Sequence, residues 1–397
     1  GELFGADGMV PVTSKYNHLV TSFGLKALAP VYELMNQLIE SGNVSKQKFS
    51  ADPRPLDPNV PSSFLQDFVF KNFMYSKQDD YEKQLTQLGI MEKDAYTCTC
   101  YMDEVGNTPA MGEVLSWSES SAVVYANSVL GARCNRNSGI IDLMGSVVGY
   151  VPRFGLLTDE GRKATWIVKI ETTKKPEAQL LGSAIGMKVM ADVPYIVGLD
   201  KWLGGELDDA AKTYLKDFGA ATASNGAVGL YHVENITPEA VKYGKDLIAE
   251  DAKVYVVDDA ELQRVYESYP VIWKKKEAKP KLCFMGCPHM SLQQLIDWTE
   301  KVSQSLKEAG RTRVCIPTVF TAAPAVLKKF QETPYAEALK ATGVITSYIC
   351  PLMYMNNPLS EKMPVITSSN KLRTYTSARY YTDAEILEQI TKGGADR

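Results

Sequence analysis

The feature that most constrains the fold is a regular alternation of short apolar strands and amphipathic helices from residue 281 onwards. Residues 281–286 (KLCFMG) and 343–350 (GVITSYIC) fit buried strands, and residues 291–310 fit a helix that ends at Gly310. Further strands are predicted at 313–320 and 363–369, and further helices at 323–342 and 382–394. Strands that alternate with helices are joined by right-handed crossovers and form a parallel sheet. The pattern therefore predicts an α/β fold with parallel sheets flanked by helices.

Thiol and polar side chains follow the strands of this predicted sheet. Cys287 comes directly after the first strand, and Cys350 ends a later one. Ser368 and Ser369 end the strand at 363–369, and Lys371 lies just beyond. Because ligands of open α/β sheets collect outside the carboxyl ends of the strands, we expect these side chains to form part of one site.

The rest of the chain divides into two further regions. Between residues 164 and 268, strands are predicted at 165–171, 227–233 and 253–258, and helices at 208–223 and 237–250. Nearer the start, helices are predicted at 25–41, 64–87 and 121–130, with a proline-rich loop at 51–63. The lysine-rich segment 273–281 fits a solvated linker. We expect three domains, an N-terminal α/β region (1–160), a central α/β domain (161–272) and a C-terminal parallel α/β domain (281–397).

Composition excludes several classes of function. A net charge of −4 gives no electrostatic footprint for nucleic acid. No apolar run approaches the roughly 20 residues that cross a membrane. The seven cysteines, an odd number scattered over 397 residues, do not fit a secreted disulfide framework. We therefore expect a cytoplasmic protein without nucleic-acid or membrane partners, whose functional thiols are ligands or nucleophiles.

A second concentration of polar residues lies between positions 96 and 139. It holds Cys98, the Ser-Glu-Ser-Ser run around Glu119, and the pair Asn135-Arg136. The serines and the glutamate also fit an ordinary helix start, with Ser118 as its cap, so a structural role stays open. Together with Lys371, the charged and amide groups favour a pocket for an anionic, oxygen-rich ligand.

Local motifs do not identify the chemistry by themselves. The pairs Cys98/Cys100 and Cys283/Cys287 lack the C-x2-C spacing of a zinc ribbon, and ferredoxin spacing is missing. A Cys287–His289 hydrolase pair is disfavoured, since residues two apart at a strand end seldom face each other. No G-x-S-x-G, Walker loop or G-x-G-x-x-G is present. Any single cysteine could equally be a small buried hydrophobe.

Read together, several motifs resemble those of the aconitase X family, relatives of the iron–sulfur hydro-lyase aconitase. They are GELFGADGMVPVTS, YTCTCY, GNTPAMGEVLSWSESSAVVYANSVLGAR with the following CNR, ATASNGAVGLYHVENITPEA, GCPHMSLQQL, the cysteine after ITSYI, and TSSNKLRTY. The resemblance covers essentially the whole chain. It implies an aconitase-like multi-domain architecture and the activity of a hydro-lyase, or dehydratase.

The resemblance also implies a cofactor and a partner. Carried over by motif position, Cys98, Cys287 and Cys350 would bind an iron–sulfur cluster, 4Fe-4S favoured and 2Fe-2S possible. Three protein ligands leave one iron open to a substrate hydroxyl. In two-subunit members a small subunit supplies the serine that acts as base. Since no such extra domain is visible in this sequence, we expect a small-subunit partner and a heterodimer.

The family implies two competing substrates, both small hydroxy acids. One is mevalonate 5-phosphate, dehydrated to anhydromevalonate phosphate in the mevalonate pathway, and the other is cis-3-hydroxy-L-proline. The sequence NRNSG after GAR resembles the phosphomevalonate type, and Arg136 suits a phosphate that the proline derivative lacks. We expect catalytic roles for Glu119, Ser120 and Lys371, with Glu119 as a support or a proton-handling group. We expect substrate contacts from Ser121, Asn135, Arg136 and Ser369.

The sequence also departs from the family pattern. Cys100 stands where a proline is expected and Cys134 where a threonine is expected, so either could be a stray ligand. The region from His18 to Gly24 matches a histidine-rich motif poorly, and the chain starts as if inside a domain, so relatives would have a preceding segment. Two rivals remain open, a non-catalytic iron–sulfur or metal-binding protein and a zinc site built from the same thiols.

Overall fold

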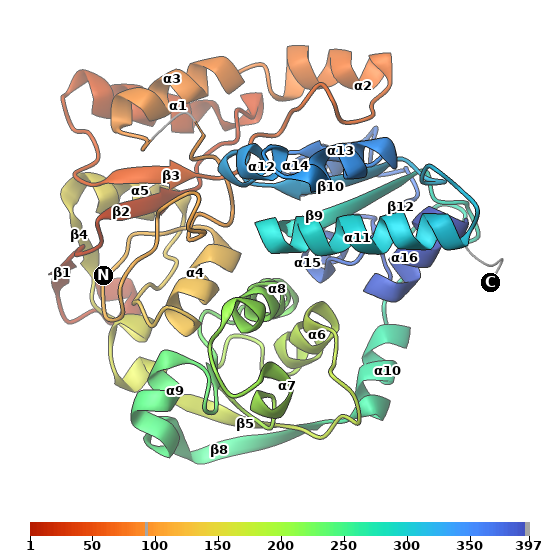
Figure 1. The fold of residues 1–397 in the computed structure, drawn as a ribbon. Coiled ribbons are helices and arrows are strands. Elements are labelled where there is room, and N and C mark those ends of the chain that lie inside the picture. The colour runs from red at the N-terminus through yellow and green to blue at the C-terminus, as the bar shows by residue number, and fades with distance from the viewer. Residues whose placement is uncertain (92–93, 394–397) are drawn as a thin grey trace.

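The computed structural model describes residues 1–91 and 94–393 and confirms the predicted α/β architecture (Figure 1). Within those residues, a five-stranded and a four-stranded sheet are both parallel throughout. Helices α6 and α8 lie between the two sheets in Figure 1, and α8 contacts both β9 and α15 of the five-stranded sheet's region.

The five-stranded sheet has the order β11-β10-β9-β12-β13. Its strands are β9 (Leu282–Met290), β10 (Thr318–Ala322), β11 (Ile345–Ser347), β12 (Val365–Thr367) and β13 (Arg379–Tyr380). The chain runs outward from β9 through β10 to β11 and then returns to the other side of β9 as β12. Neighbours β9 and β12 therefore form a topological switch point, where the carboxyl ends of parallel strands open a crevice.

The helices of this region differ in detail from the predicted ones. They are α11 (Leu292–Glu308), α12 (Pro324–Gln331), α13 (Pro334–Ala341), α14 (Pro351–Met355), α15 (Asn370–Tyr375) and α16 (Asp383–Lys392). The predicted helix 323–342 is two helices, because Pro334 cannot continue α12 and instead starts α13. The predicted strand 313–320 begins only at Thr318, because the Cys315 N–H is bonded to the Ile390 carbonyl outside the sheet.

The four-stranded sheet has the order β7-β6-β5-β8. Its strands are β5 (Ala164–Ile170), β6 (Pro194–Val197), β7 (His232–Val233) and β8 (Ile248–Val257). Its helices are α6 (Ala178–Val189), α7 (Asp200–Leu203), α8 (Asp209–Asn225), α9 (Pro238–Tyr243) and α10 (Asp259–Glu267), with a 3-10 turn η6 (Gly244–Leu247). The predicted helix 237–250 stops at Tyr243, and its last residues belong to β8.

The N-terminal region wraps around one side of both sheets (Figure 1). Strand β1 (Met9–Pro11) pairs antiparallel with β4 (Tyr150–Pro152), and β2 (Tyr16–Leu19) pairs parallel with β3 (Lys48–Ala51). Its helices are α1 (Ala29–Glu40), α2 (Phe64–Val69), the π-helical η3 (Phe70–Met74), α3 (Gln78–Leu88), α4 (Ser120–Ser128) and α5 (Gly139–Val148). Short 3-10 turns are η1 (Glu2–Phe4), η2 (Lys26–Leu28), η4 (Gly155–Leu157) and η5 (Glu160–Arg162).

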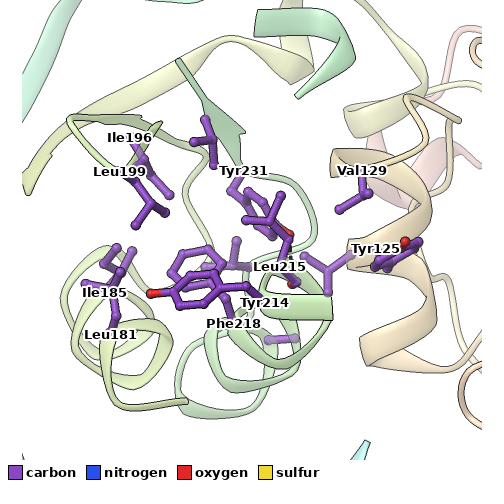
Figure 2. Packing of buried hydrophobic residues seen from close by; sticks show 14 of the residues in the cluster. Tyr125, Val129, Leu181, Ile185, Ile196, Leu199, Tyr214, Leu215, Phe218 and Tyr231 are labelled. Carbon is purple, nitrogen blue, oxygen red and sulfur yellow. Dashed lines mark hydrogen bonds between the residues drawn. The ribbon is translucent and has the colours of Figure 1, made fainter. Parts of the chain in front are cut away.

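Helix α4 is the link between the N-terminal region and the four-stranded sheet. Every residue of α4 from Ser121 to Ser128 is buried, as expected of a helix that is surrounded by other elements. Figure 2 shows Tyr125 of α4 and Val129, directly after it, on the segment that lies beside α8. There Phe218 of α8 meets Tyr231, just before β7, edge to face at 4.9 Å. This core fixes the N-terminus of α4, which faces the switch point of the other sheet.

None of the helices in the described residues combines the length and the apolar character that crossing a bilayer requires.

Candidate active site

The switch point brings together side chains that the sequence placed at strand ends. Cys287 lies in β9, and Ser369, two residues after the end of β12, caps the N-terminus of α15. The Ser369 hydroxyl donates to the Cys287 carbonyl and accepts the Leu372 N–H at 3.1 Å. This hydroxyl ties the two strand ends together, and Lys371 follows in the first turn of α15.

The N-terminal region supplies residues from α4 and the loop that follows it. Glu119, rather than the expected Ser118, is the N-cap of α4, and its carboxylate accepts the Ala122 N–H at 2.6 Å. A carboxylate suits this position because free N–H groups and the positive end of the helix dipole face it. Ser120 begins the helix, and Arg136 lies beyond its other end.

These elements enclose a cavity of about 410 Å³. Cys98, Cys287 and Cys350, which are far apart in the sequence, all line it. The remaining predicted site residues that line it are Glu119, Ser120, Arg136 and Lys371. Thus three thiols, two cations, a carboxylate and a hydroxyl face one space.

The three thiols are suited to metal ligation once deprotonated. Burial raises the pKa of Cys98, Cys287 and Cys350 above the ordinary value for a thiol. A bound metal reverses this preference, because coordination stabilises the thiolate. Cys98 also accepts the His289 N–H at 3.4 Å, a contact that stabilises negative charge on sulfur.

The arrangement of the thiols bears on the kind of metal group. Among residues 1–91 and 94–393, no three or more His, Cys, Asp or Glu side chains are grouped around one point as ligands of a single ion. Three thiols that instead face a shared cavity suit a polynuclear cluster, in which each ligand binds a different iron atom. The donor set therefore fits an iron–sulfur cluster.

A buried ion pair joins the two walls of the cavity. Lys371 Nζ donates to the Glu119 carboxylate and, at 3.2 Å, to Ser121 Oγ. Burial opposes the ionisation of Glu119, but the Lys371 ammonium and the hydrogen bonds from Ser121 and Ala122 together outweigh it and lower the pKa of Glu119. Burial likewise disfavours the ammonium, but the Glu119 carboxylate, together with Cys287 and Cys98, outweighs it and raises the pKa of Lys371. Both groups are thus charged at neutral pH.

Asp52 is a cavity residue that the sequence analysis missed. It directly follows β3 and lines the cavity, and its Oδ1 lies 3.5 Å from Nε2 of the fully buried His18 in β2. Burial and the Glu119 charge raise the pKa of Asp52 to about 6, although His18 opposes them. A signal existed in the sequence, because the aspartate ends a short β-rich run just before the proline-rich loop.

Two serines predicted as ligand contacts support the cavity from behind. Ser121 Oγ donates to Glu119 at 2.7 Å and accepts from Lys371, and Ser369 joins β9 to α15. Neither serine is among the described residues that line the cavity. Their roles as direct substrate contacts remain predictions.

Asn135 is turned away from the cavity. Its amide donates to the Phe154 carbonyl at 2.9 Å and accepts the Leu156 N–H at 2.7 Å, so it holds the turn between them. Within the described residues it is not part of the cavity lining. The neighbouring Arg136 has the opposite arrangement, since it lines the cavity and its guanidinium forms no hydrogen bond or ion pair with any described residue.

The two extra cysteines are structural in their contacts. Cys100 and Cys134 are fully buried, and neither is among the described residues lining the cavity. The Cys134 thiol donates to the Trp117 carbonyl at 3.3 Å. These contacts favour packing and hydrogen bonding over stray ligation.

Comparison with known proteins shows which family the chain resembles. The family profile described as "Aconitase X first domain" matches residues 1–160, and "Aconitase X second domain" matches residues 164–267. The crystal structure of aconitase X from Thermococcus kodakaraensis in its holo-form superposes with a TM-score of 0.77 at 26% identity. That superposition covers 98% of this chain and 92% of the other.

Two curated relatives illustrate the activities found among similar proteins. The phosphomevalonate dehydratase large subunit of Thermococcus kodakarensis is 31% identical over 352 residues, which is 88% of this chain and 79% of the relative. The cis-3-hydroxy-L-proline dehydratase of Hypocrea jecorina is 33% identical over 218 residues, which is 53% of this chain and 34% of the relative. The profiles, the relatives and the shared fold together establish that the chain belongs to the aconitase X family.

Proposed function

We propose that this chain is the large subunit of a hydro-lyase that dehydrates mevalonate 5-phosphate to anhydromevalonate phosphate. The observation that carries the proposal is the convergence of three thiols, the Glu119–Lys371 ion pair and Arg136 on one cavity. The likeness to phosphomevalonate dehydratase large subunits over most of both chains supports this substrate over cis-3-hydroxy-L-proline.

Cys98, Cys287 and Cys350 are the proposed ligands of an iron–sulfur cluster. A 4Fe-4S cluster is favoured over 2Fe-2S, because three thiolates leave one of four irons without a protein ligand. When bound, such a cluster supplies a Lewis-acidic iron that makes a substrate hydroxyl a better leaving group. Cys287 and Cys350 are buried and Cys98 is half-buried, which supports a site largely shielded from bulk solvent.

Lys371, Glu119 and Ser120 are the proposed catalytic residues of this chain. An ammonium has three N–H donors, and Lys371 uses two of them on Glu119 and Ser121. The third is free to stabilise a carboxylate or a developing negative charge on the substrate. Because the pKa of Glu119 is lowered, this group acts as a support for Lys371 and not as a base.

Arg136 is the proposed phosphate-binding residue. Its guanidinium lines the cavity, has no protein partner among the described residues and can bind phosphate oxygens in two parallel hydrogen bonds. Ser121 and Ser369 hold the cavity wall, and Asn135 holds the loop that carries Arg136. A proline-derived substrate has no phosphate for this cation to bind.

A small-subunit partner completes the proposal. The designation of the relatives as large subunits supports a heterodimer, and the partner would supply the serine that removes the proton. All seven cysteines are free, which supports a reducing cytoplasmic location.

The test is turnover of mevalonate 5-phosphate by the anaerobically purified complex with its small subunit. Replacing Arg136 with alanine is expected to raise the KM for this substrate by about 10- to 100-fold, since one charged hydrogen-bonding group is lost. Arg153→Ala is the matched control, because that arginine forms an exposed ion pair with Asp7. Turnover of cis-3-hydroxy-L-proline alone, unaffected by Arg136→Ala, would replace the proposed substrate with the alternative.

A further inference from the structure

The loop that carries Arg136 is anchored on both sides of that residue. Upstream, the Arg133 N–H is bonded to the Glu113 carbonyl, and Asn135 is bonded to residues 154–156. Downstream, the Asn137 amide and the Ser138 N–H both bind the Asp142 carboxylate. Only the guanidinium of Arg136 is left without a partner in the described chain. The loop therefore presents one cation on a fixed backbone.

Arg136 itself has a backbone conformation that its side chain disfavours. Its φ is 53°, in the left-handed region that residues with a Cβ adopt rarely and at a cost. Such conformations persist where surrounding contacts determine them, and they concentrate at functional sites. The question is which contact holds this one.

The Cys134 thiol makes that contact. Its sulfur accepts the Arg136 N–H at 3.4 Å. Side chains of turn residues commonly bind the backbone N–H two residues later in this way and so stabilise the turn. The same thiol donates to the Trp117 carbonyl at 3.3 Å, two residues before Glu119. One fully buried sulfur thus connects the turn at Arg136 to the segment that leads into α4.

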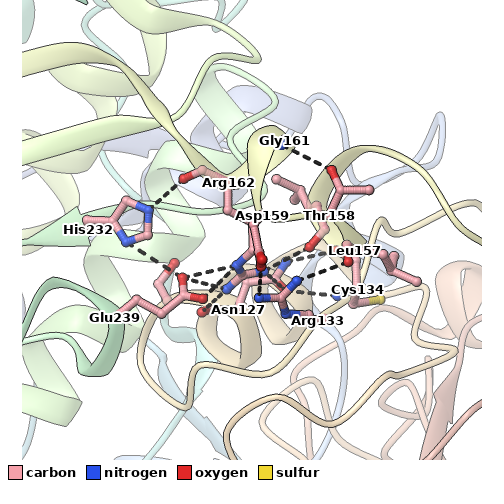
Figure 3. Close-up of polar contacts among 12 residues, drawn as sticks. Asn127, Arg133, Cys134, Leu157, Thr158, Asp159, Gly161, Arg162, His232 and Glu239 are labelled. Carbon is pink, nitrogen blue, oxygen red and sulfur yellow. Dashed lines mark hydrogen bonds and ion pairs between the residues drawn. The ribbon is translucent and has the colours of Figure 1, made fainter. Parts of the chain in front are cut away.

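Cys134 is in turn held by a buried polar network (Figure 3). The Asn127 amide accepts the Cys134 N–H at 2.9 Å and donates to the Cys134 carbonyl at 2.8 Å. Arg162 Nη2 donates to the Asn127 carbonyl at 3.1 Å and also to Glu239 at 2.8 Å. Because these groups are buried and mutually bonded, the backbone of Cys134 has little freedom to move.

We propose that Cys134 is a positioning residue that directs Arg136 into the cavity and thereby sets the affinity for the anionic end of the substrate. Asn127 and Arg162 fix the backbone of Cys134, and its thiol fixes the left-handed turn at Arg136. This inference rests on the proposed function of Arg136 as the phosphate-binding residue. It also gives a purpose to a cysteine that is neither a cavity residue nor a disulfide partner.

The test compares Cys134→Val with Cys134→Thr in the complex with its small subunit. The two variants have nearly the same shape, but only threonine can donate to the Trp117 carbonyl and accept the Arg136 N–H. Valine is expected to raise the KM for mevalonate 5-phosphate about tenfold, as for the loss of a hydrogen-bonded constraint, with kcat within about twofold. Threonine is expected to restore the KM, and iron content is expected to stay unchanged in both.

Combination with Arg136→Ala separates the inference from the proposed function. If Cys134 acts through Arg136, Cys134→Val has no further effect on KM once Arg136 is alanine. An unchanged KM for Cys134→Val beside a raised KM for Arg136→Ala would overturn the inference and leave the function intact. An unchanged KM for Arg136→Ala would contradict both the proposed role of Arg136 and the inference about Cys134. A loss of kcat that persists in the double variant would also overturn the inference about Cys134. If Cys134→Val fails to fold, Cys134→Ala takes its place.

Discussion

Two buried ion pairs in this molecule have nearly the same exposure but different surroundings. The Glu119 and Lys371 side chains are 6% and 7% exposed, and those of Glu239 and Arg162 are 5% and 1% exposed. Arg162 has acceptors for all of its N–H groups, in Glu239, Asn127 and the Leu156 carbonyl. Lys371 has two partners for three N–H groups and faces the cavity.

This difference separates a structural pair from a functional one. A fully satisfied buried pair has no hydrogen-bonding capacity left for a ligand, so it can only hold elements together. A pair with a spare donor at a cavity retains capacity for a substrate, and its strong local field is available to a reacting group. We therefore expect stability to depend on Arg162–Glu239 and catalysis to depend on Glu119–Lys371.

The largest expected effect follows from Lys371→Met. Loss of a positioned cation is expected to lower kcat by on the order of 100- to 1,000-fold, as for removal of a positioned electrostatic donor. Stability is expected to fall less than on breaking the structural pair, because Glu119 keeps the Ala122 N–H and the Ser121 hydroxyl as donors. Steady-state kinetics and urea unfolding measure the two effects. Near-normal kcat would contradict the distinction.

Glu239→Gln is expected to have the converse result. It leaves the Arg162 guanidinium buried without its counter-charge, which costs about 3–5 kcal/mol of unfolding free energy. The kcat of the folded variant is expected to stay close to that of the unmodified protein. Glu261→Gln is the matched control, since Glu261 pairs with an exposed Arg264 and surface pairs contribute about 0–1 kcal/mol. Equal destabilisation by Glu239→Gln and Glu261→Gln would contradict the structural role of the Arg162–Glu239 pair.

His232 gives the structural network a dependence on pH. Burial, together with the Arg162 charge, lowers the pKa of His232 to about 4 from its ordinary 6.5. In the unfolded chain His232 therefore takes up a proton near pH 6.5, whereas in the folded protein it stays neutral down to about pH 4. The free energy of unfolding consequently decreases as pH falls from 6.5 towards 4. At about 1.4 kcal/mol per pH unit the loss is about 3 kcal/mol. Urea unfolding of the protein and His232→Gln at pH 7 and pH 4 isolates this contribution. A gap between the two proteins that does not change with pH would refute it.

The fold was predictable where periodicity and strand ends carry the information. The alternation of strands and helices after residue 281 predicted the parallel sheet, and Cys287, Cys350 and Lys371 do emerge at one cavity. These residues were accessible to sequence reasoning because parallel topology alone brings the carboxyl ends of strands together. Pro334 was an overlooked signal, since it splits the helix predicted at 323–342.

Other parts of the site were not predicted, because their weak local signals do not show which long-range contacts form. The carboxylate of Asp52 is recruited by the pairing of β2 with β3, and neither strand has a strong periodic pattern. Asn135 and Arg136 are adjacent in sequence, but a left-handed turn directs Asn135 to the backbone of residues 154–156 and Arg136 into the cavity. Such a turn at arginine is determined by its surroundings, so no local propensity indicates it.

The most direct test of the account is iron and acid-labile sulfide content after anaerobic purification or reconstitution. The comparison is between the unmodified protein, Cys350→Ser and the matched control Cys315→Ser, whose thiol is exposed and outside the cavity lining of the described chain. The account predicts that the unmodified protein and Cys315→Ser bind iron and sulfide and that Cys350→Ser loses both. Full iron and sulfide in Cys350→Ser, or an unmodified protein that no reconstitution can load, would contradict the three-thiol site.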